Sequence, residues 1–330
     1  MPFATYRQLF MNRGLVVIVA LLCSTCATKN VDPKPAEPVK AFFTKLIQIV
    51  EQNSINRREI DWADYKAKVW AKVGNTQTVP ESESAMVLAL ALLKDNHSTI
   101  IVDNKRSLYG GTGCQVLPAL TPFTFAEPNI GYVKVESFTG SSQEGINFAR
   151  AIQNEIARQD DENLKGWIVD LRRNGGGNMY PMIAGLGPLI GEGTCGYFYD
   201  IDNKPTASFA YQQGGALLNQ TVLVQVEKPY QLVSSNSKIA VLISGSTASS
   251  GEATALAFVG RPNTRLLGAA SCGLSTGNQS YDLPFYGYKL NLFTVRIGDR
   301  TGKVYGKEIV PDDILPYEQS IANAVKWINR

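Results

Sequence analysis

The sequence predicts an α/β fold in which a small N-terminal helical subdomain precedes a larger layered domain. Three observations lead to this prediction. Apolar residues recur at helical spacing near the N-terminus, short β-branched runs then alternate with helical segments, and 330 residues are enough for a full core. The 44% hydrophobic and 18% charged residues are ordinary for a globular protein.

Residues 1–27 have the layout of a signal peptide. Two arginines precede the apolar run Leu15–Leu22, and small residues follow up to Ala27. The run is shorter than the roughly 20 apolar residues of a membrane-spanning helix, so we expect cleavage after Ala27 and export to the periplasm or the cell exterior. The alternative is lipid modification of Cys23 or Cys26, which would leave a lipid anchor as the attachment to the membrane.

The remaining elements follow in order after a proline-rich linker at 28–38. Helices expected between residues 39 and 94 make up the helical subdomain of residues 39–95, and the larger domain spans 96–330. Its expected strands are 130–135, 167–171, 222–225, 239–243, 289–295 and 304–310, and its expected helices are 144–157, a segment after 177, 250–259 and 317–329. Strands that alternate with helices in this way predict a mostly parallel sheet.

Charge and cysteine content exclude some classes of function and of site. The formal net charge is +3, and lysines and arginines are scattered, so we exclude nucleic-acid binding. After the N-terminal segment the cysteines are Cys114, Cys195 and Cys272, a spacing typical neither of a disulfide framework nor of a metal site. We therefore expect at most one disulfide and a free thiol left over.

The strongest chemical signal is an apolar strand that runs through a turn of small residues, Ser244–Ser249, directly into a helix. A hydroxyl at such a turn lies at the helix N-terminus, where the N–H groups and the helix dipole favour an oxyanion. Ser249 is therefore a candidate nucleophile. The alternative is that Thr247, Ser249 or Ser250 only caps the helix, with Glu252 in its first turn.

A second turn carries three consecutive glycines, Gly175–Gly177, shortly after a buried strand that ends at Asp170. Glycines let the backbone approach a ligand closely, and exposed N–H groups there can stabilise developing negative charge. A phosphate site is disfavoured because the turn has neither a G-x-G-x-x-G motif nor a P-loop lysine.

His97 is the single histidine of the chain and follows a predicted helix that ends at Lys94. A serine nucleophile needs a general base within hydrogen-bond reach, and no other imidazole exists to provide it. A lone histidine is more often structural. Its position at a helix-to-loop junction, in a chain that also has a nucleophile turn, favours the catalytic role.

From about Val39 to Pro316 the sequence resembles the tail-specific (C-terminal-processing) serine peptidase family. The stretches that carry the resemblance, in the family's order, are Ile130–Phe138, Val169–Gly177, Ser246–Glu252 and Val310–Asp312. The resemblance implies a crotonase/ClpP-like spiral catalytic domain at 96–330, with Ser249 as nucleophile and the amides of Gly176 and Ser250 as oxyanion hole. It also implies a serine-type peptidase that cleaves peptides or unfolded protein tails without a metal or cofactor.

The family's usual base is absent. Bacterial tail-specific enzymes carry a lysine in a Gly-Lys-Gly context, whereas this sequence has Leu274, which cannot take a proton. The tricorn-like branch instead uses a histidine from an upstream segment, which the His97 segment resembles. That branch orients its histidine through a carboxylate near the C-terminal Val-Pro-Asp motif. Glu308 is the candidate, although strict register would place Tyr305 there, and Ser98 is a candidate for a second hydrogen bond.

The span from His97 to Ile130 is too short for the PDZ module of about 90 residues that many relatives insert. We therefore expect the peptidase domain itself to hold the substrate. Two other functions stay open. One is a catalytically inactive protein that binds a peptide or small ligand on the same fold, and the other is an esterase that uses the same nucleophile.

Overall fold

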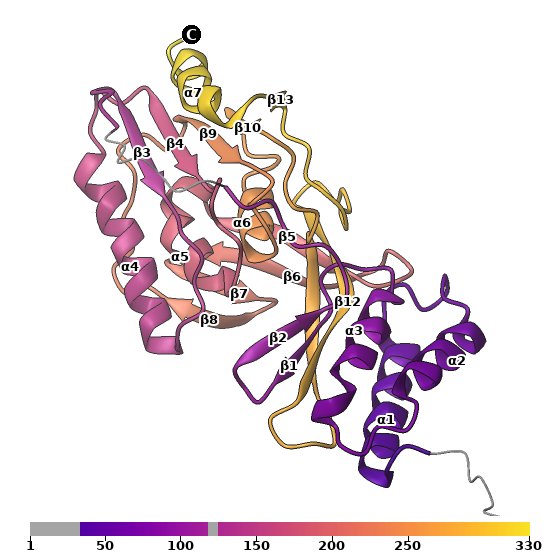
Figure 1. Ribbon diagram of the computed structural model, residues 1–330. Helices are drawn as coiled ribbons and strands as arrows, with labels where there is room; N and C mark the ends of the chain where they lie inside the picture. Colours follow the sequence, from indigo (N-terminus) through magenta and orange to yellow (C-terminus); the bar gives the residue numbers. More distant parts are fainter. Residues whose placement is uncertain (1–33, 118–124) are drawn as a thin grey trace, which may run out of the picture. The chain divides into compact units, whose positions relative to one another are not determined.

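The computed structural model describes residues 34–117 and 125–330, which belong to one compact unit that begins at Lys34 (Figure 1). The predicted signal peptide and the linker as far as residue 33 lie outside the described residues. Within the described part, no helix combines the length and apolar character needed to cross a membrane.

The described N-terminal part contains the helices α1 (Glu37–Asn53), α2 (Trp62–Val73) and α3 (Glu83–Ala91). Asp61 caps α2, because its carboxylate accepts hydrogen bonds from the backbone N–H groups of two residues in the first turn at 3.0 and 3.1 Å. The apolar faces of the helices share one hydrophobic cluster with the strands β1 (Thr99–Val102) and β12 (Lys289–Asp299). The helices are therefore attached to the larger sheet through a common core.

A parallel sheet of five described strands has the order β13-β10-β9-β4-β3. Its strands are β3 (Ile130–Lys134), β4 (Gly166–Asp170), β9 (Lys238–Ile243), β10 (Thr264–Gly268) and β13 (Asp313–Ile314). Every residue of β4 is buried. Parallel strands that are covered on both faces appear in a sequence as continuous apolar runs, which is why three of these strands could be predicted.

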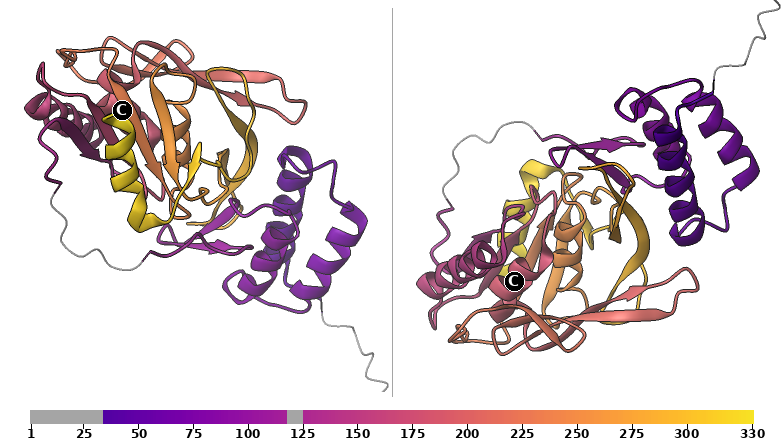
Figure 2. Two further views of the ribbon diagram at one scale, coloured as in Figure 1. Left: turned by 90° about the horizontal axis from the view of Figure 1, so that it is seen from above. Right: turned by 90° about the horizontal axis from the view of Figure 1, so that it is seen from below.

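Helices cover both faces of this sheet. They are α4 (Ser142–Gln159), α5 (Met179–Ile190) and α6 (Ser250–Leu256) on one face and α7 (Ser320–Ile328) on the other. Trp167 and Val169 of β4 pack in the cluster of α4, α5 and α6, whereas Ile168 packs in the cluster of α7. Figure 2 shows α7, in yellow, beside the orange strands of the sheet. The helices expected in these four places, and the α/β class, are confirmed.

The other described sheet has eight strands and is antiparallel throughout, in the order β2-β1-β12-β5-β6-β7-β8, with β11 also paired to β12. Its further strands are β2 (Arg106–Tyr109), β5 (Gly193–Tyr199), β6 (Pro205–Gln212), β7 (Gly215–Leu218), β8 (Thr221–Gln225) and β11 (Thr276–Asp282). The expectation of a mostly parallel sheet holds for the five-stranded sheet and is wrong for this eight-stranded one. The turn between β6 and β7 has two residues, Gln213 and Gly214, both with positive φ, and such short turns join antiparallel strands.

The prediction of a strand at 304–310 is also wrong. Val304 forms an isolated bridge with Gly298, and the chain then runs on without regular structure. Gly306 has a φ of +146°, which interrupts an extended conformation. This irregular segment lies against the candidate site.

Candidate active site

The nucleophile turn joins the end of β9 to the start of α6. Ser249 has φ +52° and ψ −116°, a strained conformation for a residue with a side chain. Ser249 and Glu252 form a capping box, in which the Glu252 carboxylate accepts a hydrogen bond from the Ser249 backbone N–H at 2.7 Å. The capping role is therefore present. It is compatible with a nucleophile, because a hydroxyl that accepts a hydrogen bond still has its own proton to give.

Glu252 connects this turn to the loop before β11. Its other carboxylate oxygen accepts hydrogen bonds from the Ser271 hydroxyl at 2.5 Å and from the Gly273 N–H at 3.0 Å. Glu252 is fully buried, and burial raises its pKa to about 7, against the lowering effect of these hydrogen bonds. The loop that supplies Thr276 is thereby held at a fixed place relative to Ser249.

The glycine turn packs directly against the nucleophile turn. Gly176 has a φ of +106°, and a Cβ added to it would lie 2.9 Å from the Cβ of Ser249, so the position requires glycine. The Gly176 N–H, which the sequence suggested for the oxyanion hole, donates to the Asn174 side chain at 3.0 Å. By contrast, the N–H groups of Gly177 and Ser250 have no acceptor among the described residues, and both residues line the cavity that contains Ser249.

The loop of His97 is held by Asp95. The Asp95 carboxylate accepts hydrogen bonds from the backbone N–H groups of His97 and Ser98 at 3.0 and 2.6 Å, and from the Ser98 hydroxyl at 2.9 Å. The Asn278 side chain donates to the His97 carbonyl at 3.0 Å. Burial lowers the pKa of His97 to about 4, because it disfavours the charged imidazolium.

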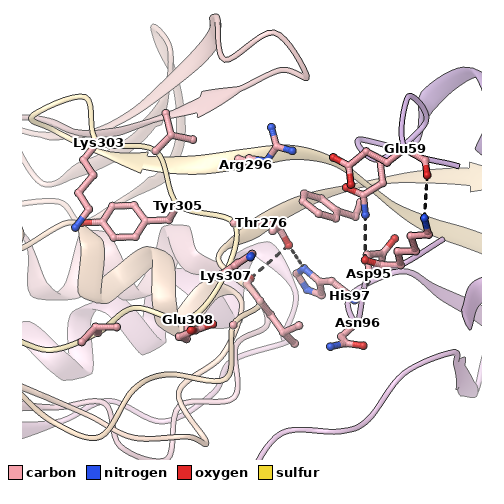
Figure 3. A pocket seen from close by; sticks show the side chains of 18 residues that line it. Glu59, Asp95, Asn96, His97, Thr276, Arg296, Lys303, Tyr305, Lys307 and Glu308 are labelled. Atoms are coloured by element: carbon pink, nitrogen blue, oxygen red, sulfur yellow. Dashed lines mark hydrogen bonds between the residues drawn. The ribbon is translucent and has the colours of Figure 1, made fainter. Parts of the chain in front are cut away.

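Thr276 is the side chain that contacts the imidazole. Its Oγ1 hydrogen-bonds His97 Nδ1 and donates to the Leu274 carbonyl at 3.4 Å (Figure 3). This contact is compatible with a tautomer in which Nδ1–H donates to Thr276 and Nε2 accepts a proton. Leu274 thus contributes its backbone carbonyl to the arrangement.

The three partners suggested for His97 by the sequence have other environments. The Ser98 hydroxyl donates to the Asp95 carboxylate and accepts a hydrogen bond from the Phe293 N–H. The Tyr305 hydroxyl donates to Asp299 at 2.9 Å. Glu308 is exposed, and its side chain makes no hydrogen bond within the described residues, although it lines a cavity with His97 (Figure 3). Thr276 was not predicted from the sequence. The available signal was its place two residues after Leu274.

Ser249 and His97 line one cavity of about 630 Å³ together with Ser250, Gly177 and Thr276. Among the described residues no hydrogen bond joins Ser249 to His97. In enzymes without substrate, catalytic hydrogen bonds are often long and tighten when substrate binds. The arrangement can therefore support attack by a serine on a carbonyl, with an imidazole as base. No group of three or more His, Cys, Asp or Glu side chains suited to a metal ion occurs in residues 34–117 and 125–330.

The segment after β2 is attached by a disulfide to the loop before β11 and by hydrogen bonds to the nucleophile turn. A disulfide joins Cys114 to Cys272, and Cys195 is a buried free cysteine, which confirms the expectation of at most one bridge and a free thiol. The Gln115 N–H donates to the Gly245 carbonyl at 3.1 Å, and the Ser246 hydroxyl donates to the Gln115 carbonyl.

Replacing Cys114 and Cys272 together with serine is expected to lower the free energy of unfolding by about 2–5 kcal/mol, because the bridge closes a loop across 158 positions. Guanidinium unfolding followed by circular dichroism measures the change. Dithiothreitol serves as the control, since it should shift the parent curve and leave the double variant unchanged. Superimposable parent and variant curves would contradict the expectation.

Comparisons with known proteins identify the family and the fold. The sequence profile of the family described as "Peptidase family S41" matches residues 129–315, more than half of the chain. The chain is 28% identical over 322 residues to a protein called "Nisin-resistance protein" from Lactococcus lactis subsp. lactis, and the match covers 96% of each chain.

Three solved structures share the fold. A lipoprotein from Streptococcus agalactiae has a TM-score of 0.66 at 21% identity, with 88% of this chain and 96% of that chain covered. A putative peptidase from Parabacteroides merdae has a TM-score of 0.59 at 17% identity, with 88% and 97% covered. A photosystem II D1 C-terminal processing protease has a TM-score of 0.52 at 13% identity, with 86% and 94% covered. The crotonase/ClpP-like fold with a helical N-terminal region is thus confirmed.

Proposed function

The chain belongs to peptidase family S41, and from that membership we propose that it is an exported serine endopeptidase with Ser249 as nucleophile and His97 as general base. The observation that carries the proposal is that Ser249 sits in a strained turn at a helix start and lines one cavity with His97. The export part of the proposal rests on the signal-peptide layout of residues 1–27.

In the proposed reaction, His97 Nε2 accepts the Ser249 hydroxyl proton as the oxygen bonds to the peptide carbonyl carbon. The N–H groups of Ser250 and Gly177 donate to the oxyanion, so Gly177 takes the place first assigned to Gly176. His97 then gives the proton to the leaving amine as the C–N bond breaks. Water hydrolyses the acyl-enzyme by the same two steps and restores the serine.

The experiment that tests this proposal is labelling with a fluorophosphonate, which reacts with an activated serine. We expect mass spectrometry to find the label on Ser249, and we expect no labelling of the Ser249→Ala variant. A folded parent protein that takes no label at Ser249 would favour the inactive binding protein. Labelling with hydrolysis of a small acyl ester, but of no peptide, would favour the esterase.

Nisin is the first peptide to test as a substrate. The proposal that this chain acts on it rests on the similarity to the Lactococcus protein, which extends over nearly the whole length of both chains. Incubation of nisin with the parent protein and with Ser249→Ala, followed by mass spectrometry, should give a cleavage product only with the parent. An intact peptide together with a labelled Ser249 would keep the peptidase and exclude this substrate.

Thr276 is proposed as the positioning residue for His97. Thr276→Val is expected to lower kcat about tenfold with little change in KM, since it removes one hydrogen bond to the base, and Thr276→Ser should restore most of the rate. The melting temperature of each variant is the control, because a purely structural role would lower stability together with the rate. Equal kcat values for parent and Thr276→Val would remove Thr276 from the mechanism.

A further inference from the structure

A second cavity, of about 720 Å³, lies beside His97. Of its described lining residues, only His97 and Thr276 also line the cavity of Ser249. Figure 3 shows that Lys303, Tyr305, Lys307 and Glu308 form one side of it and that Glu59, Asp95 and Asn96 form the other. A peptide whose carbonyl lies at Ser249 can therefore continue past His97 into this second space.

The two cavities differ in charge. No Asp, Glu, Lys or Arg is among the described residues that line the cavity of Ser249. Four cationic side chains line the second cavity: Lys94, Arg296, Lys303 and Lys307. The boundary between a neutral and a charged surface falls at the proposed catalytic base.

None of the four cations has a carboxylate partner in the described part of the chain. Lys94 donates to a backbone carbonyl at 2.9 Å, Arg296 donates to the neutral Asn203 at 3.4 Å, and the Lys303 ammonium lies 4.9 Å from the centre of the Tyr305 ring. Lys307 is exposed and, in the described part of the chain, its ammonium makes no hydrogen bond.

The acidic side chains of the cavity do not balance these charges. They are Glu59, Asp95 and Glu308. The Asp95 carboxylate already accepts three hydrogen bonds from His97 and Ser98, which hold it on its own loop. Three acidic side chains therefore stand against four cations, and the excess positive charge of the lining attracts an anionic group.

We infer that the second cavity binds a carboxylate of the peptide substrate, while the cavity of Ser249 takes the uncharged residues next to the cleaved bond. This inference rests on the proposed peptidase function. A carboxylate is the anionic group that peptides carry, either at the C-terminus or on Asp and Glu side chains. The planar guanidinium of Arg296 matches its two oxygens, and the lysines add charge without fixed geometry.

The test compares peptides that differ only in one carboxylate. The series consists of a neutral peptide with a free C-terminus, the same peptide with a C-terminal amide, and the amide with one glutamate downstream of the cleaved bond. The parent should cleave the free acid with a kcat/KM about tenfold above that of the amide, mostly through a lower KM, and added salt should reduce this ratio. Recovery of the rate by the glutamate peptide would assign the site to side-chain carboxylates, and no recovery would assign it to the terminus.

Two variants test the residues. Lys307→Gln and Arg296→Gln should each bring the acid-to-amide ratio toward one, whereas Lys326→Gln, on the exposed face of α7, should leave it unchanged. Lys307 is exposed, so its substitution keeps the test valid even where Arg296→Gln disturbs the fold.

Binding to the Ser249→Ala variant separates this inference from the proposed function. Fluorescence anisotropy should show tighter binding of the labelled free acid than of the amide, whether or not the parent hydrolyses either peptide. Equal binding of the two peptides, or cleavage of both by the parent with the same kcat/KM, would overturn the carboxylate site and leave the peptidase intact. Absence of cleavage of every peptide with unequal binding would contradict the peptidase and keep the site.

Discussion

Ser249→Ala is expected to lower kcat for peptide hydrolysis by about ten-thousand-fold or more, and His97→Ala is expected to have nearly the same effect. The two residues act as a unit, since a serine without its base keeps its proton and a base without the serine has no proton to accept. The double variant should therefore be no slower than either single variant. Single-turnover and steady-state rates on a peptide that the parent cleaves provide the measurement.

Ser142→Ala is the matched control for the dyad variants. Ser142 is an exposed serine at the start of α4 that lines neither cavity, so its loss also removes a hydroxyl at a helix start and the rate should stay within about threefold. Leu274→Lys should also fail to raise the rate, because a lysine base needs a site that desolvates and aims its amine. Robust activity in a folded His97→Ala protein would exclude the histidine mechanism, and a large gain from Leu274→Lys would identify a decayed Ser-Lys enzyme.

The ascending limb of kcat/KM against pH is expected to have its midpoint near pH 4. The imidazole must be neutral to accept the serine proton, and burial lowers the pKa of His97 to about 4, so the base stays available through mildly acidic conditions. At pH 5 the rate should be about thirtyfold higher than for an imidazole with the ordinary pKa of about 6.5. Rates between pH 3.5 and 9 on one neutral peptide measure this limb.

Two variants identify the groups behind the profile. Glu308→Gln should leave the limb in place, because the Glu308 side chain makes no hydrogen bond to His97 in the described part of the chain. An inflection near pH 7 that disappears in Glu252→Gln would belong to Glu252, whose pKa burial raises to about 7. A limb at or above pH 6.5 that moves down in Glu308→Gln would instead show a carboxylate that stabilises the imidazolium, as the sequence first suggested.

The parts of the fold that could be predicted are those with a local signal. The central strands β4 and β9 are buried on both faces, so each appears as an apolar run, and the turns after them carry the glycines and the serine in an uninterrupted stretch of sequence. The antiparallel strands β5, β6 and β11 are half exposed and contain glycines and polar residues, so their alternation is weak. Their pairing is decided by contacts with β12 and with each other that no short window contains.

The candidate site likewise contains residues that a local sequence signal could predict and contacts that it could not. Ser249 and His97 could be proposed from residue type and local context. The contact of Thr276 with His97 joins residues 179 positions apart, and two of the partners suggested instead, Ser98 and Tyr305, have closer acceptors in Asp95 and Asp299. The choice of Gly177 over Gly176 depends on a side chain, Asn174, that occupies one amide and not the other.

The Cys114–Cys272 disulfide has a consequence for when the protein acquires its final form. Disulfides persist in oxidising compartments and are kept reduced in the cytosol. In a chain that is exported as proposed, the segment after β2 is held near the nucleophile turn by hydrogen bonds alone during synthesis, and its covalent bond to the loop before β11 forms only after translocation. The disulfide near the candidate site then forms only in a compartment that the cell's cytosolic proteins do not enter.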